Sequence, residues 1–225
     1  MSHKGIKWIM HRGLSSKFTE NTMESFIAAS KIENIFGIET DIHLTSDNVF
    51  VCHHDKTTDR IYGVSHEIKY TDYDVLKKLG VVKLISLVEL AKLTNKHLFI
   101  ELKEYMNVEE IASFYHYYKE NQFSNFTVIS FHRENLSSLR ELDPKIPMLL
   151  LDDKVTDDNF EFVLKYNIGF SLHYQAINEE TMKKILTHQI ELNVWTVNDI
   201  KLVLKLHQLG VRCFTTDKDF TQDIL

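Results

Sequence analysis

Two acidic residues stand two positions apart in the apolar segment 38–42 (IETDI). Residues i and i+2 of a β-strand face the same side, so the side chains of Glu39 and Asp41 should project together. Neighbouring carboxylates repel each other and are costly to desolvate unless a cation lies between them. Oxygen ligands suit a hard divalent ion such as Mg²⁺ or Ca²⁺. A third acid, Glu101, lies in a similar segment, with Lys103 two positions later.

Strand-like and helix-like segments alternate along most of the chain, and this alternation predicts a parallel sheet. The expected strands centre on Trp8, Glu39, Leu98–Leu102, Ile129, Leu150, Ser171, Val194 and Phe214. Residues suited to cap the intervening helices include Asn21 or Thr22, Thr156, Asn178 and Asn198. Eight such units favour a closed (β/α)8 TIM barrel. An open doubly wound sheet is the alternative, but no glycine-rich phosphate-binding segment follows the first strand.

The interval between the second and third strands departs from this pattern. Residues 45–48 are typical of a turn, and Val49–Cys52 of a returning strand. Short helices are expected near Asp74–Leu79 and Ser86–Leu93. We therefore expect one domain over residues 1–225, with a small hairpin and helical insertion at about 44–96.

Residues at the C-terminal ends of barrel strands gather at one rim, where catalytic groups lie. That rim should collect His11, Arg12, Glu39, Asp41, Glu101, Lys103, Phe131, His173 and Trp195, with His54 added by the hairpin. Arginine and lysine suit phosphate oxygens, and two histidines can act as general base and general acid. Because barrel strands are rarely exposed, a site is favoured over a solvated strand face for Glu39 and Asp41. A packed or capping role for His173 is an equal alternative to substrate contact.

These residues also resemble, in order and spacing, those of the glycerophosphodiester phosphodiesterase family. The matching motifs are His11-Arg12-Gly13, Glu20-Asn21-Thr22 with Ser25-Phe26, Glu39-x-Asp41 with Leu44-Thr45-x-Asp47, Val51 to His54-Asp55, Glu101-x-Lys103, Ser130-Phe131, Trp195-Thr196-Val197-Asn198 and Thr216-Asp217. Together they cover nearly the whole chain, and the ordered set is specific. Two departures leave substrate size open: Ile85-Ser86-Leu87 replaces a Pro-Thr-Leu-type helix start, and the segment after His54-Asp55 is short.

The resemblance implies a (β/α)8 barrel that binds one divalent cation, Mg²⁺ or Ca²⁺, and hydrolyses glycerophosphodiesters to sn-glycerol 3-phosphate and an alcohol. By this resemblance the metal ligands are Glu39, Asp41 and Glu101, and the catalytic histidines are His11 and His54. Arg12 and Lys103 would contact the phosphate, and Trp195 would line the glycerol side of the pocket. Phe131 and His173 are further candidates for substrate contact.

Two other functions are considered. A phosphodiesterase of phospholipase D type could cleave lysophospholipids, passing through or stopping at a cyclic phosphate. A catalytically silent barrel could instead bind phosphate ligands or partners, and would be expected to lack at least one metal ligand or catalytic histidine. All five of those residues are present.

The resemblance implies a small-molecule substrate as partner, and composition gives no sign of a macromolecular one. A net charge of −6 at pH 7 gives no reason to expect nucleic acid or an anionic membrane as partner. No apolar run approaches the length of a membrane span, so no stable membrane insertion is expected. The apolar segment Ile6–Met10 is too short for a signal-peptide core, which favours a cytoplasmic protein. Cys52 and Cys213 are expected to be free and buried, and an exposed apolar helix face would allow a homodimer.

Overall fold

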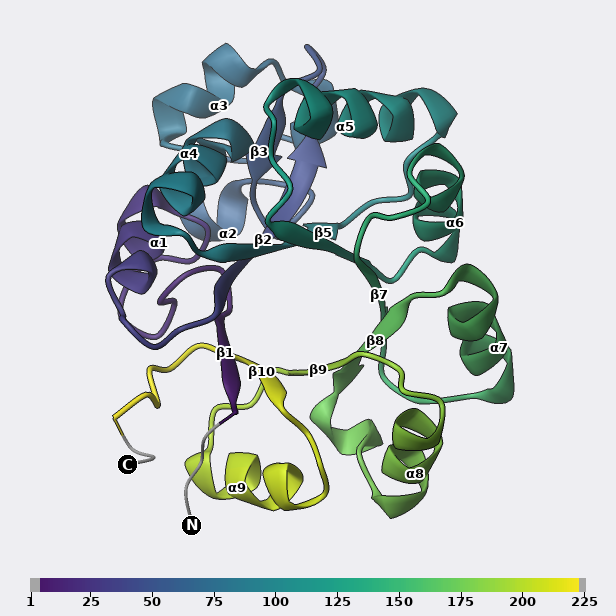
Figure 1. The fold of residues 1–225 in the computed structure, drawn as a ribbon. Helices are drawn as coiled ribbons and strands as arrows, with labels where there is room; N and C mark the ends of the chain where they lie inside the picture. Colours follow the sequence, from purple (N-terminus) through teal and green to yellow (C-terminus); the bar gives the residue numbers. More distant parts are fainter. Residues whose placement is uncertain (1–4, 223–225) are drawn as a thin grey trace.

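The computed structural model describes residues 5–222; the two ends of the expected domain, residues 1–4 and 223–225, lie outside the described part. Eight parallel strands form a closed ring: β1 (Lys7–Met10), β2 (Gly37–Leu44), β5 (His97–Leu102), β6 (Phe126–Ser130), β7 (Met148–Asp152), β8 (Gly169–His173), β9 (Leu192–Trp195) and β10 (Cys213–Thr216). Strand β1 pairs with both β10 and β2, which closes the barrel. The predicted (β/α)8 barrel is confirmed, and each expected strand centre lies in one of these strands (Figure 1).

Helices connect successive barrel strands and surround the ring (Figure 1). They are α1 (Met23–Ser30), α4 (Leu84–Thr94), α5 (Val108–Glu120), α6 (Arg133–Leu142), α7 (Asp157–Tyr166), α8 (Glu179–Thr187) and α9 (Ile200–Gln208). The side chains of Thr22, Thr156 and Asn178 accept hydrogen bonds from backbone N–H groups in the first turns of α1, α7 and α8. These capping residues were predicted, because each precedes its helix with a short polar side chain.

The expected cap of the last helix was wrong by one residue. Asp199, not Asn198, caps α9 by accepting from the backbone N–H of Lys201. The Asn198 side chain accepts from the backbone N–H of Asp217 at 2.9 Å and from the Thr216 hydroxyl at 3.1 Å. Contacts with the end of β10 therefore displace Asn198 from the capping role.

The insertion extends the sheet beyond β2. Strand β3 (Phe50–Cys52) runs antiparallel to β2, and a two-residue strand that was not expected, β4 (Val82–Lys83), runs antiparallel to β3. Between them lie α2 (Asp59–Tyr62), the 3-10 turn η1 (Ile68–Tyr70) and α3 (Tyr73–Leu79). A separate small apolar cluster, which includes Ile68 and Leu76, packs this region together.

The apolar core forms two layers separated by the strands. The outer layer fills the space between strands and helices and contains the buried side chains of Phe26, Phe114 and Phe170. The inner cluster fills the barrel itself with Ile9, Phe99, Ile129, Leu149 and Leu151. The inward-facing polar residues lie between this inner cluster and solvent, at the C-terminal ends of the strands.

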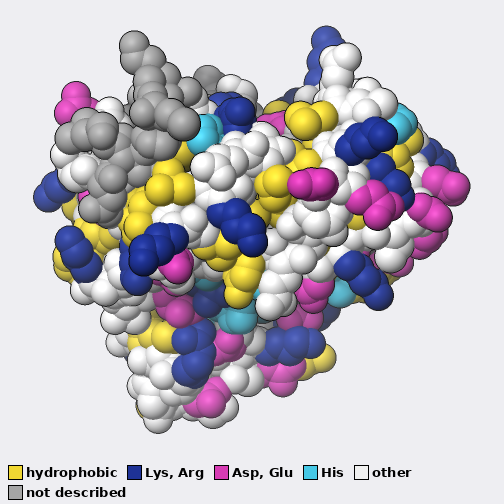
Figure 2. All heavy atoms as spheres, turned by 90° about the horizontal axis from the view of Figure 1, so that it is seen from below, with side chains coloured by type: hydrophobic (Ala, Val, Ile, Leu, Met, Phe, Trp, Pro, Cys, Tyr) yellow, Lys and Arg dark blue, Asp and Glu magenta, His cyan; other side chains and the backbone are white. Residues whose placement is uncertain are grey.

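The described surface carries mixed charge. Figure 2 shows one face, on which Lys and Arg are interspersed with Asp and Glu and apolar side chains are scattered among them. Across residues 5–222, no helix combines the length and the hydropathy that crossing a membrane requires. Both cysteines are free thiols, as expected; Cys52 is buried, whereas Cys213 is half-buried and not buried as expected.

Candidate active site

Three buried carboxylates meet inside the upper barrel. Glu39 and Asp41 lie on β2, and Glu101 lies on β5 as the direct register partner of Asp41. One oxygen of each lies within 4.8 Å of the others. Asp41 Oδ1 is buried and accepts no hydrogen bond. We call these three residues the acid cluster.

The cations near the acid cluster do not balance its three carboxylates, and the pKa values of two of the acids are raised as a result. Burial, with the nearby Asp41 charge, raises the pKa of Glu39 well above its ordinary value. The same two causes raise the pKa of Glu101 to about 7. Burial also works to raise the pKa of Asp41, but Arg12 and Lys103 hold it lower, at about 2. Three clustered carboxylates, with one buried oxygen that accepts no hydrogen bond, fit a hard divalent cation.

Two cationic side chains flank the acid cluster. Lys103 Nζ lies 2.8 Å from Glu101 Oε1 and 3.6 Å from Asp41 Oδ1. Arg12 Nε lies 3.0 Å from Asp41 Oδ2. The Arg12 backbone N–H donates to Glu39 Oε2 at 3.0 Å, from a left-handed conformation with φ 55°. Both cations reach the cavity, but they are engaged with the acids there.

The glycine after Arg12 is required by close packing. Gly13 has φ 81°, and a Cβ at this position would lie 2.3 Å from Ser25 Oγ and 2.7 Å from the Ser25 backbone. A larger residue would push the Arg12 loop away from α1. The His-Arg-Gly motif therefore has a steric reason for its third position.

His11 directly follows β1, and its ring is held by Asp217, which follows the last strand, β10. Its Nδ1 lies 2.7 Å from Asp217 Oδ1, and its Nε2 lies 4.0 Å from Glu39 Oε2. Burial works to raise the pKa of Asp217, but hydrogen bonds from His11, Asn198 and Ser15 lower it to about 2. An ionised Asp217 places the imidazole proton on Nδ1 and leaves Nε2 facing the acid cluster.

His54 follows β3 and has the same arrangement with a different partner. Its Nδ1 lies 2.6 Å from Oδ1 of the adjacent Asp55. Burial lowers the pKa of His54, which favours the neutral ring. The neighbouring rings of His43 and His53 bond to the backbone carbonyls of His54 and Thr57, and neither residue is among those that line the cavity.

An aromatic wall faces the histidines across the cavity. Phe131 and Trp195 meet edge to face at 5.8 Å between ring centroids, and the Trp195 indole donates to the Ser171 carbonyl at 2.9 Å. His173 packs against Trp195 at 5.2 Å between ring centroids and is not among the residues that line the cavity.

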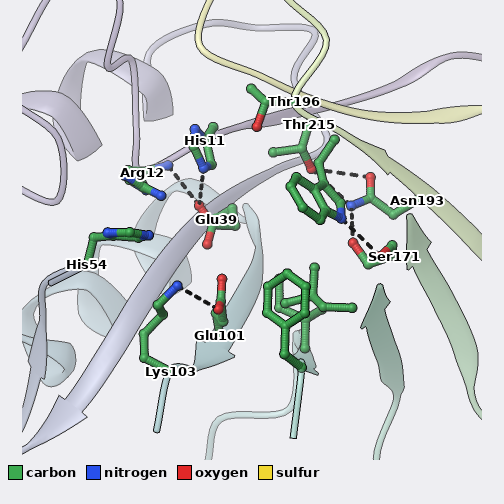
Figure 3. Close-up of a pocket in the computed structure, with 14 residues that line it drawn as sticks. His11, Arg12, Glu39, His54, Glu101, Lys103, Ser171, Asn193, Thr196 and Thr215 are labelled. Carbon is green, nitrogen blue, oxygen red and sulfur yellow. Dashed lines mark hydrogen bonds and ion pairs between the residues drawn. The ribbon is translucent and has the colours of Figure 1, made fainter. Parts of the chain in front are cut away.

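Most of the predicted site residues therefore share one cavity of about 270 Å³. It is lined by His11, Arg12, Glu39, His54, Glu101, Lys103, Phe131 and Trp195. Asp41 is fully buried beneath it. Figure 3 shows His11, Arg12, Glu39, His54, Glu101 and Lys103 converging on this space from β1, β2, β5 and the insertion.

A polar patch on the far side of the cavity was not predicted. Asn193 Nδ2 donates to Ser171 Oγ at 2.9 Å and to Thr215 Oγ1 at 3.0 Å, and Thr196 lies above them (Figure 3). The i, i−2 alternation from Trp195 identifies Asn193 as inward-facing. The alignment of Ser171 and Thr215 with it depends on strand register, which is not visible in the sequence.

Comparisons with known proteins agree over nearly the full length. The profile of the glycerophosphoryl diester phosphodiesterase family matches residues 11–219. The glycerophosphodiester phosphodiesterase of Bacillus subtilis is 28% identical, over 94% of this chain and 83% of that protein.

Solved structures have the same fold. A glycerophosphodiester phosphodiesterase from Parabacteroides distasonis has a TM-score of 0.82 and 27% identity, covering 95% of this chain and 93% of that one. An Oleispira antarctica phosphodiesterase, solved in complex with the product sn-glycerol-3-phosphate, has a TM-score of 0.86 and 22% identity, covering 96% of each chain. On the profile match over residues 11–219, this chain belongs to the glycerophosphoryl diester phosphodiesterase family of hydrolases.

Proposed function

We propose that this protein hydrolyses glycerophosphodiesters to sn-glycerol 3-phosphate and an alcohol, with a bound divalent cation, Mg²⁺ or Ca²⁺. One observation carries the proposal: two histidines with Nδ1 on a carboxylate open onto the same cavity as the acid cluster. The product seen in the Oleispira antarctica neighbour is consistent with this reaction.

The acid cluster, Glu39, Asp41 and Glu101, would hold the cation. A cation bound there supplies Lewis-acid stabilisation of a non-bridging phosphate oxygen. Arg12 would present its guanidinium to the phosphate while its other contacts, to Asp41 and Glu20, keep it in place. Lys103, on a flexible stem, would turn from Glu101 toward the phosphate.

The two histidines would carry the proton transfers. One Nε2 removes a proton from the attacking hydroxyl or water, and the other protonates the departing alkoxide. In each ring the carboxylate on Nδ1 keeps the reactive nitrogen directed at the cavity; it stabilises the imidazolium that the base becomes and the imidazolium from which the acid donates. Phe131 and Trp195, with His173 behind them, would form the wall against the glycerol or alcohol group.

The alternatives have less support. The silent-barrel hypothesis requires a missing catalytic group, and all five are present and grouped at one cavity. Cleavage of lysophospholipids has no specific observation in its favour. A single domain over residues 1–225, a cytoplasmic location and a homodimer stay predictions.

Release of glycerol 3-phosphate from glycerophosphoethanolamine and glycerophosphocholine tests the proposal. The assay is run with Mg²⁺, with Ca²⁺ and with chelator, on the wild type, His54→Ala and Glu101→Gln. Glu109→Gln, an exposed position on the adjacent α5, is the matched control. We expect metal-dependent release that both site variants lose and the control retains. A folded wild type that releases no glycerol 3-phosphate with either metal contradicts the proposal.

A further inference from the structure

A chain of ion pairs connects the Arg12 loop to the segment that carries His54. Glu20, in the loop between β1 and α1, accepts through Oε1 from Arg12 Nη1 at 2.9 Å and from Arg60 Nη2 at 2.6 Å. Arg60 also donates through Nε to Asp55 Oδ2. Asp55 in turn lies 2.6 Å from His54 Nδ1. One glutamate oxygen therefore joins the Arg12 loop to the segment that carries His54.

We propose that Glu20 is a positioning residue that couples the Arg12 loop to the His54 segment at the active site. It holds Arg12 beside the acid cluster and, through Arg60 and Asp55, holds His54 over the cavity. The catalytic consequence rests on the function proposed above, whereas the mechanical coupling does not.

The part of the insertion that carries Arg60 has few apolar contacts of its own. Helix α2, which carries Arg60, has four residues, no side-chain cap and no buried residue. The small apolar cluster of the insertion centres on β3, η1 and α3, and Tyr62 is the α2 residue packed against it. A short helix with little burial is not held by its apolar contacts alone. Hydrogen bonds of the His43 and His53 rings hold the backbone around His54, and the contacts of Arg60 with Glu20 and Asp55 add a restraint on the Asp55 side chain.

Burial and charge at Glu20 fit this role. The Glu20 side chain is 20% exposed and that of Arg60 is 45% exposed. Partial burial works to raise the pKa of Glu20, but hydrogen bonds from Arg60 and Arg12 hold it below its ordinary value, so the group is ionised. Ion pairs this close to solvent contribute little to global stability, so their loss should disturb geometry more than folding.

Kinetics of paired variants test the coupling. Glu20→Gln keeps the shape and removes the charge, and we expect kcat to fall about tenfold, the scale of losses from residues behind a catalytic group. Arg60→Met should have a similar effect, and the double variant should fall no further than the worse single variant. Arg60→Lys, which cannot contact both carboxylates as a fork, should be intermediate. Glu24→Gln, an exposed position in the first turn of α1, is the control and should leave kcat and the unfolding midpoint unchanged.

A second readout needs neither substrate nor metal. The ¹⁵N resonances of His54 report which ring nitrogen carries the proton, and the contact with Asp55 places it on Nδ1 in the neutral ring. We expect the protonated share of Nδ1 to fall in Glu20→Gln and in Arg60→Met, and to stay at the wild-type value in Glu24→Gln. An inactive wild type would overturn the proposed function and leave this signal to decide the coupling. Unchanged His54 signals in both variants, or rate losses that multiply in the double variant, would overturn the coupling.

Discussion

His11 and His54 present the same chemistry to one cavity from two differently built regions. Each ring has Nδ1 on a carboxylate, at 2.7 Å in one case and 2.6 Å in the other. His11 extends a strand of the closed barrel, and its partner Asp217 is 206 residues away at the end of β10. His54 lies on the insertion, and its partner is the next residue.

The supports behind the two carboxylates differ in the same way. Asp217 accepts from Ser15 Oγ and from the Asn198 side chain, and its backbone N–H donates to Asn198. Asp55 forms an ion pair with Arg60, whose side chain is 45% exposed. The barrel thus orients its histidine through a carboxylate held by neutral hydrogen-bond donors, and the insertion uses ion pairs with a more exposed arginine. Since salt screens exposed charges, the orientation of His54 should be held less firmly than that of His11 and should depend more on salt.

Removing each histidine gives the largest expected effect and separates their roles. His11→Ala and His54→Ala should each lower kcat on a glycerophosphodiester by about 10²- to 10⁴-fold. A substrate whose leaving group is p-nitrophenolate needs no general acid, so it should restore rate in only one of the two variants. Steady-state kinetics on both substrates measure this. Equal recovery in both variants would contradict the division into one acid and one base.

Asp217→Asn should destabilise the fold more than Asp55→Asn. The pKa of Asp217 is lowered from 3.8 to about 2, which corresponds to about 2 kcal/mol of unfolding free energy at neutral pH. Asp55 is paired with Arg60, whose side chain is 45% exposed, so solvent screening should keep the cost of its loss below about 1 kcal/mol. Urea unfolding at pH 7 gives both values. The comparison fails if the order is reversed.

The Asp217 contribution should also depend on pH in a defined window. Its pKa in the folded state is below that in the unfolded chain, so its stabilisation is present above about pH 4 and is lost as the pH falls through about 2. The unfolding free energies of the wild type and Asp217→Asn should therefore converge over this range. Denaturant unfolding at a series of pH values measures the difference, and a constant gap down to pH 2 would show that Asp217 acts by another route.

A change in salt concentration should have the smallest effect on kcat, and this effect should arise from the ion pairs of Arg60 in the insertion. Raising NaCl from about 0.05 to 0.5 M shortens the screening length severalfold, and we expect roughly a twofold fall in kcat through the Arg60 contacts. Arg60→Met has already lost these contacts, so its remaining kcat should not respond. An equal salt response in the two proteins would place the effect elsewhere, for example at substrate phosphate.

Local patterns account for the elements that were predicted. Strand centres and most helix caps follow from alternation, 3.6-residue periodicity and short polar residues before apolar ones. Strand β4 was missed because two residues have no periodicity of their own and form a strand only by pairing with β3. Asn198 and Asp199 are both good capping residues, and contacts with β10 decided between them.

The sequence by itself determined the barrel, and it determined that Glu39 faces the same side as Asp41, since parity within one strand is a local property. The pairing of Asp217 with His11 and of Glu20 with Arg60 was decided only by the tertiary structure. The first depends on closure of the ring, which places Met10 opposite Thr216. The second depends on where the insertion lies against the Arg12 loop. Hydrogen bonds act over about 3 Å, so partners distant along the chain are chosen by packing and not by neighbouring sequence.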